Sequence, residues 1–153
     1  MKKILITGIG SILRGDDGIG SRVIDELRKE VLPEGIRLYA GDVSGLDLLK
    51  LFPDYDRVIV IDAADMNAPA GMIKVFDSRD IRKAEFSDCL STHGMTLLQT
   101  LTLAEQLELK CEITIVGIQP EDISYRLSVT DTLEQIIPKA VKIIKDFVLT
   151  RLV

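Results

Sequence analysis

Apolar residues are arranged in two alternating patterns along this chain. Five short runs rich in β-branched residues are typical of buried strands, and they predict strands at 3–7, 36–40, 58–61, 72–76 and 113–116. Between and after these runs, apolar residues recur every three to four positions, which predicts helices over 21–31, 46–52, 95–107 and about 131–149. Strands that alternate with helices indicate a mainly parallel sheet with helices on both faces.

One connection departs from this pattern. Only about ten residues, among them Asn67, Pro69 and Gly71, separate the third predicted strand from the fourth. A crossover between parallel strands needs a dozen or more residues and is usually helical, so the fourth strand is expected to run antiparallel. The predicted fold is therefore α/β: a single three-layer domain over residues 1–153, with a five-stranded, mostly parallel mixed sheet.

Composition excludes several classes of protein. The chain has 153 residues, of which 46% are hydrophobic and 28% charged, as in an ordinary globular domain. A net charge of −5 without long blocks of one sign argues against a nucleic-acid surface or a polybasic membrane patch. No run approaches the ~20 apolar residues that span a bilayer, so no membrane insertion is expected. Cys89 and Cys111 form no C-x-x-C pair, and we expect a cytoplasmic protein with reduced thiols.

The most informative stretch is Gly8–Gly20, which reads GIGSILRGDDGIG and joins the first strand to the first helix. A dinucleotide-binding loop would need a glycine where Leu13 stands, and a phosphate-binding P-loop would need lysine where this loop has Asp16 and Asp17. Two adjacent carboxylates suit a cation. From the residues alone, either acid could face a cation, and a capping role and a binding role could coexist in the pair.

Two further groups are expected at the same edge of the sheet. Asp62 ends the third predicted strand, and His93, the only histidine, precedes the third predicted helix. The loops that follow parallel strands meet at one edge, so an acid of the Asp16–Asp17 pair can converge there with Asp62 and His93. This mixed oxygen and nitrogen set suits nickel, zinc or cobalt better than calcium or magnesium, and three protein ligands leave open coordination positions.

Each of these residues also has a simpler interpretation. Asp16 or Asp17 could cap the first helix, Asp62 could form a turn or an ion pair, and His93 could be an ordinary surface residue. Asp42, in the loop after the second strand, is interpreted as a turn and cap residue. A serine-hydrolase triad lacks the G-x-S-x-G elbow. The coincidence of three such groups at one sheet edge favours the metal-binding interpretation.

These motifs resemble those of the hydrogenase maturation proteases, the endopeptidases that trim nickel–iron hydrogenase large subunits. The family's opening signature, G-x-G-N-x-L-x-x-D-(D/E)-(G/A)-x-G, corresponds to residues 8–20, with Ser11 in place of the usual asparagine. An apolar strand ending in Asp-Ala, a Ser/Thr-x-His before a helix, and a late Gly-Ile-Gln-Pro correspond to residues 60–63, 91–93 and 117–120. These motifs occur in the family's order over nearly the whole chain. The stretches 61–66 and 117–120 resemble most closely the branch that processes hydrogenase-3-type enzymes.

The resemblance implies an aspartyl-type endopeptidase that removes the C-terminal extension of a large-subunit precursor after nickel insertion. Carried over by motif, Asp17, Asp62 and His93 are the catalytic and metal-binding residues. Asp16 is then expected to support the turn and the helix start. The nickel is supplied by the substrate, so no permanent cofactor is expected, and a precursor without nickel lacks the ligand that docks it. Whether the metal polarises the scissile carbonyl or a carboxylate activates water stays open.

Two other functions remain as alternatives. The same three ligands would serve a non-catalytic nickel-binding assembly factor, which would bind the precursor and release it uncut. A nucleotide-binding flavodoxin-like domain is the third possibility, and the acidic loop argues against it.

Overall fold

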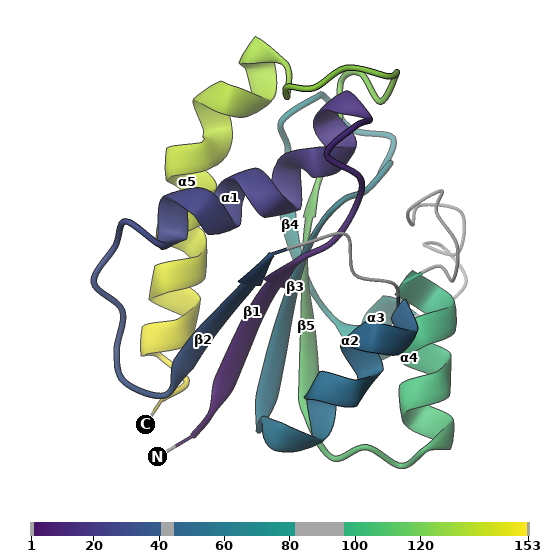
Figure 1. The fold of residues 1–153 in the computed structure, drawn as a ribbon, viewed down its shortest axis with the longest axis vertical. Helices are drawn as coiled ribbons and strands as arrows, with labels where there is room; N and C mark the ends of the chain where they lie inside the picture. The colour runs from purple at the N-terminus through teal and green to yellow at the C-terminus, as the bar shows by residue number, and fades with distance from the viewer. Residues whose placement is uncertain (1, 41–44, 82–96, 153) are drawn as a thin grey trace.

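The computed structural model of the chain describes residues 2–40, 45–81 and 97–152. Within these ranges the strands form one sheet in the order β2-β1-β3-β5-β4 (Figure 1). The strands are β1 (Ile4–Gly8), β2 (Ile36–Ala40), β3 (Arg57–Ala63), β4 (Ile73–Asp77) and β5 (Glu112–Ile118). All neighbouring strands are parallel except β4, which pairs antiparallel with β5. The predicted mixed sheet and its one reversed strand are therefore confirmed.

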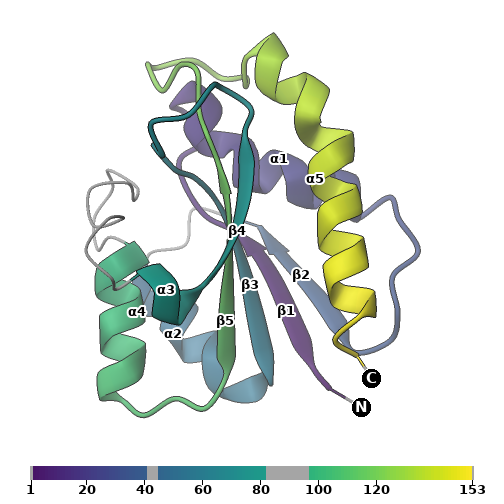
Figure 2. The ribbon, with the colours of Figure 1, turned by 180° about the vertical axis from the view of Figure 1, so that it is seen from behind.

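Helices cover both faces of the sheet (Figures 1 and 2). On one face lie α1 (Ile19–Leu27) and α5 (Asp131–Leu149), and on the other lie α2 (Gly45–Leu51) and α4 (Leu97–Gln106). The short helix α3 (Ser78–Ile81) follows β4 and was not predicted, because four residues carry too little periodicity. Two 3₁₀ turns, η1 (Gly15–Gly18) and η2 (Phe52–Asp54), precede α1 and β3. No described helix has the length and apolar character of a membrane span, and a cytoplasmic location stays a prediction.

The central strands are apolar on both sides because each side faces its own layer of helices. In β3, Ile59 and Ile61 belong to the core under α1 and α5, whereas Val58 and Val60 belong to the core under α2 and α4. Successive side chains of a strand alternate between faces. Asp62, the next residue of β3, therefore lies on the α2 and α4 face.

Two glycines let β1, β3 and α1 meet backbone to backbone. A Cβ on Gly8 would lie 2.3 Å from the carbonyl carbon of Gly20, and a Cβ on Gly20 would lie 2.5 Å from the carbonyl oxygen of Ile61. Any side chain at either position would force these elements apart. The glycines thus hold the loop after β1 tightly against the end of β3.

Candidate functional site

The loop after β1 wraps around Asp17. Gly10 adopts a φ of 108°, and a Cβ there would lie 2.1 Å from the Asp17 carbonyl oxygen, so the close approach requires glycine. The backbone N–H of Ser11 donates a hydrogen bond of 2.9 Å to Asp17 Oδ2. Asp17 itself is only 4% exposed. The predicted glycine-rich loop therefore encloses and orients one carboxylate.

Ser11, which replaces the family's asparagine, uses its side chain locally. Its hydroxyl accepts a hydrogen bond of 3.2 Å from the N–H of Leu13. The contact with Asp17 comes from the backbone of Ser11, which any residue other than proline could supply. The substitution therefore leaves the support of Asp17 intact.

Asp16 has a different role from the one that the sequence suggested. Its carboxylate is fully buried and accepts hydrogen bonds from the N–H groups of Glu121, Asp122 and Thr130 and from the Thr130 hydroxyl, at 2.6–3.0 Å. These partners are more than 100 residues away in the sequence. The expectation that Asp16 supports its own turn was too local, because its carboxylate ties the β1–α1 loop to the segment between β5 and α5.

Neither acid of the pair caps α1. The residue before that helix is Gly18, and no side chain accepts its first N–H groups. Thr130 instead caps α5 by accepting a hydrogen bond of 3.4 Å from Leu133 N, while it also contacts Asp16. Sequence reasoning missed Thr130, although a threonine directly before a helical pattern is a recognisable start signal.

Asp62 lies inside β3, opposite Gly117 of β5, and is fully buried. Among the described residues no hydrogen-bond partner of normal geometry reaches either of its carboxylate oxygens, and no ion pair involves it. Burial and the nearby Asp17 carboxylate raise the pKa of Asp62 well above its usual range, and the N–H of Ala63 opposes this only in part. Neither the turn interpretation nor the ion-pair interpretation of Asp62 gains support from this environment.

Two neighbouring carboxylates, one of them buried without partners, are suited to holding a cation. A buried carboxylate stays ionised only where a positive charge or several donors compensate for lost water, and otherwise it takes up a proton. The hydroxyl of Thr7, on the same face of the sheet, is also buried without a hydrogen-bond partner in the described part. The chemistry of Asp17 and Asp62 therefore fits the predicted divalent metal ion.

The third predicted ligand cannot be placed in the same way. His93 lies outside the described residues, as do Asp42 and Cys89. Among the residues that the structure does describe, no group of three histidine, cysteine, aspartate or glutamate side chains could hold a metal. Two of the three predicted site residues, Asp17 and Asp62, are thus brought together, and the position of His93 stays a prediction.

Gln119 fixes the segment that follows Asp62. Its side-chain oxygen accepts hydrogen bonds from the N–H groups of Met66 at 2.6 Å and Ala68 at 3.4 Å, and its amide nitrogen donates to Asp65 at 3.2 Å. Sequence analysis noted the Gly-Ile-Gln-Pro motif without assigning this role. The buried glutamine therefore supports the carboxyl end of β3 from the neighbouring strand.

Comparison with known proteins identifies similar sequences and folds. The family described as hydrogenase maturation protease matches residues 21–146. The hydrogenase 2 maturation protease of Escherichia coli is 31% identical over 144 residues, covering 92% of this chain and 87% of that protein. A putative hydrogenase maturation protease of Methanocaldococcus jannaschii is 30% identical, with 94% of both chains covered.

The fold comparison agrees. The structure of the hydrogenase maturating endopeptidase HybD from E. coli superposes with a TM-score of 0.80 at 26% identity, covering 93% of this chain and 89% of that one. A crystal structure of a hydrogenase 3 maturation protease gives a TM-score of 0.71 at 19% identity and shows the fold alone. These matches do not single out the hydrogenase-3 branch, so that finer placement stays a prediction.

Proposed function

Because the chain belongs to the hydrogenase maturation protease family, whose members are peptidases, we propose that it cleaves the C-terminal extension from a nickel–iron hydrogenase large-subunit precursor after nickel insertion. One observation carries the proposal: Asp62 is fully buried, lacks hydrogen-bond partners among the described residues, and lies near the carboxylate of Asp17. A cation bound between these two carboxylates would supply the positive charge that Asp62 lacks. A precursor that brings nickel with it supplies one.

In this proposal Asp17, Asp62 and His93 complete the coordination of the nickel that the precursor carries. Asp62 gives up its proton when the cation arrives, since the positive charge replaces the missing partners. Asp17 is already oriented by the N–H of Ser11. Because the three residues would recognise the metal, a precursor without nickel would be bound too weakly for cleavage, which makes metal insertion a checkpoint.

Hydrolysis adds one water molecule across the scissile peptide bond. The water oxygen forms a bond to the carbonyl carbon, the carbon–nitrogen bond breaks, and the water protons end on the new carboxyl and amino termini. A carboxylate of the site can accept the first proton and return it to the leaving nitrogen. Nickel can also lower the barrier as a Lewis acid at the carbonyl oxygen, and both routes use the same three residues.

The decisive test uses one precursor in two states. A large subunit with its C-terminal extension is prepared with and without nickel, incubated with the purified chain, and analysed by mass spectrometry of the intact products. We expect one C-terminal cut in the nickel-loaded precursor and none in the nickel-free one. Equal cleavage of both forms would refute the nickel checkpoint.

The same assay separates the alternative function. A non-catalytic assembly factor would form a complex with the nickel-loaded precursor and release it at its original mass. Observing such a complex with no product, at enzyme concentrations that equal the precursor, would favour the assembly factor over the peptidase.

A further inference from the structure

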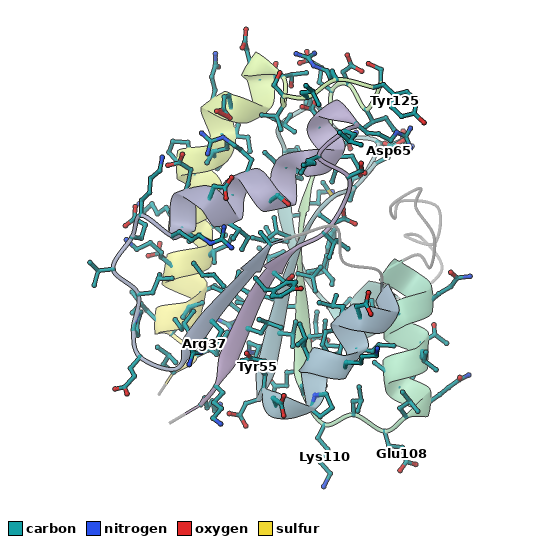
Figure 3. All side chains as sticks on the ribbon, viewed as in Figure 1. Arg37, Tyr55, Asp65, Glu108, Lys110 and Tyr125 are labelled. Atoms are coloured by element: carbon teal, nitrogen blue, oxygen red, sulfur yellow. The ribbon has the colours of Figure 1, made fainter. Side chains whose placement is uncertain are left out.

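Large apolar side chains are exposed on two loops at the carboxyl end of the sheet. In the segment between β5 and α5, Tyr125 is 88% exposed and Leu127 is 83% exposed. In the loop after β1, Ile12 and Leu13 are each about half exposed. Figure 3 shows Tyr125 at the same end of the molecule as Asp65, which follows β3. We call these four side chains the two-loop surface.

The backbone beneath the two-loop surface is held firmly. Arg14 and Arg126 form an isolated parallel β-bridge, in which Arg126 N donates to Leu13 O at 3.0 Å and Gly15 N donates to Arg126 O at 2.9 Å. Gly15 has a φ of 55°, and a Cβ there would lie 2.7 Å from the Asp122 carbonyl oxygen. The side chains are thus exposed although their backbone is ordered, which reduces the entropy lost on binding a partner.

The same contacts join this surface to the candidate site. Asp16 anchors the segment between β5 and α5 through four hydrogen bonds, and Asp17 is its neighbour in the chain. The loop that carries Ile12 and Leu13 also supplies the Ser11 N–H that orients Asp17. Ile12 and Leu127 further line one hollow of about 390 Å³, together with the start of α1. A partner bound here would be held at a fixed position relative to Asp17.

We propose that the two-loop surface binds an apolar segment of the hydrogenase large-subunit precursor and so determines which protein is presented to Asp17 and Asp62. This inference rests on the proposed function and extends it from the metal to the protein part of the substrate. Tyrosine is enriched among the residues that contribute most to binding, and the largest exposed apolar patch on a monomer is often functional.

The size of the surface favours a substrate over a second copy of this chain. Four such side chains offer on the order of 500 Å² of apolar area, whereas a standard stable interface buries ~800 Å² per partner. A transient enzyme–substrate complex can gain the remaining contact area at the metal site.

The test compares two double alanine variants at exposed apolar positions. Tyr125→Ala/Leu127→Ala removes the most exposed part of the surface, and Val31→Ala/Leu149→Ala removes exposed apolar side chains at distant positions. Cleavage of nickel-loaded precursor is measured over a range of substrate concentrations. We expect the first variant to raise KM at least tenfold with kcat changed less than twofold, and the second variant to behave as the wild type. Thermal unfolding of both should match the wild type, because exposed positions contribute little to stability.

Several outcomes would overturn the inference. One is an unchanged KM in Tyr125→Ala/Leu127→Ala, and another is a loss of kcat without a change in KM. A wild-type chain that sediments as a dimer, and becomes monomeric in that variant, would assign the surface to self-association. If the wild type itself leaves nickel-loaded precursor uncut, the proposed function fails first, which is distinguishable from failure of the surface alone.

Discussion

Two fully buried aspartates, Asp16 and Asp62, lie at the same end of the sheet in opposite environments. The Asp16 carboxylate accepts four hydrogen bonds, whereas no described residue donates one of normal geometry to Asp62. Burial of a carboxylate is costly without partners, so Asp16 has the environment of a structural group and Asp62 that of a group kept for a ligand. Burial alone therefore does not distinguish these two carboxylates. Their hydrogen-bond partners among the described residues do.

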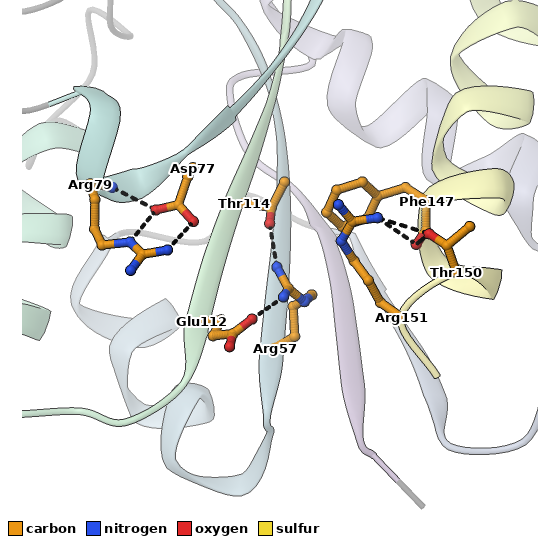
Figure 4. Close-up of polar contacts among 8 residues, drawn as sticks. All are labelled: Arg57, Asp77, Arg79, Glu112, Thr114, Phe147, Thr150 and Arg151. Carbon is orange, nitrogen blue, oxygen red and sulfur yellow. Dashed lines mark hydrogen bonds and ion pairs between the residues drawn. The ribbon is translucent and has the colours of Figure 1, made fainter. Parts of the chain in front are cut away.

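The amino end of the sheet supports this comparison, because charged groups there are paired (Figure 4). Arg57, the first residue of β3, contacts Glu112 and donates a hydrogen bond of 2.8 Å to the Thr114 hydroxyl. Asp77, the last residue of β4, is bound by Arg79 through both carboxylate oxygens at 3.0 Å. Strand β3 therefore begins at a paired arginine and carries, near its other end, an aspartate that no described residue pairs with.

The largest expected effect concerns cleavage. Asp62→Asn keeps the shape of the side chain but removes the negative charge that would bind the substrate's nickel, so we expect cleavage of nickel-loaded precursor to fall by about a thousandfold. Asp17→Asn and His93→Ala should lose activity to a similar degree. Single-turnover product formation, followed by mass spectrometry, measures the effect.

Arg57→Met provides the control at the opposite end of β3. It removes a charge from the same strand without touching the candidate site, and cleavage should stay within about twofold of the wild type. Near wild-type activity in Asp62→Asn would show that Asp62 is not part of the catalytic site. The difference between Asp16 and Asp62 would then have no functional meaning.

The next largest effect concerns stability. Asp16→Ala leaves three backbone N–H groups and the Thr130 hydroxyl without their acceptor, and we expect it to lower the free energy of unfolding by about 3 kcal/mol. Urea denaturation followed by circular dichroism measures this loss. Asp25→Asn, on the exposed surface of α1, should change stability by less than about 1 kcal/mol.

Thr130→Ser tests the mechanism of that loss. Serine retains the hydroxyl that bonds to Asp16, so this variant should keep most of the wild-type stability. A stable Asp16→Ala variant would mean that the long-range hydrogen bonds contribute little to the free energy of unfolding. Asp16 could then no longer be described as a structural group in contrast to Asp62.

Periodicity predicted the sheet well because the signals are local. The strand at 36–40 has the bounds predicted from its apolar run, and the short connection after Asp62 was enough to reveal the reversed β4. The approach of Asp17 to Asp62 followed from the rule that parallel strands end at one edge. These features depend on spacing, which a sequence displays directly.

The role of Asp16 could not be predicted in this way. Its partners are mainly backbone N–H groups of a distant loop, and such donors exist at every residue except proline. Gln119 likewise binds backbone groups, 51 and 53 residues away. Only Thr130, at a helix start, carried a local signal. Long-range contacts between a side chain and backbone leave no spacing pattern, which is why the adjacent acids Asp16 and Asp17 could not be fully separated beforehand.

The smallest expected effect is a gain in stability from the substitution that destroys activity. The pKa of Asp62 is raised in the folded chain, so the folded state holds a proton that the unfolded chain releases above pH ~4. The stability that this proton contributes is complete below that pH and is lost as the pH rises through the folded-state pKa. Asparagine has no proton to lose, so Asp62→Asn should match the wild type near pH 4 and exceed it by about 1 kcal/mol at pH 8.

Thermal unfolding of both proteins across this pH range, without added metal, measures the divergence. Asp16→Asn is the matched comparison, because it replaces the other buried aspartate and should be less stable than the wild type at pH 8. An Asp62→Asn variant that is destabilised at pH 8 would show that the carboxylate is compensated within the free protein, and the buried charge would then not be kept for a cation. The proposal expects Asp62→Asn to be more stable than the wild type only at higher pH and to lose cleavage. That pair of results would show that the free protein gives up stability at position 62 to keep a carboxylate for the substrate's cation.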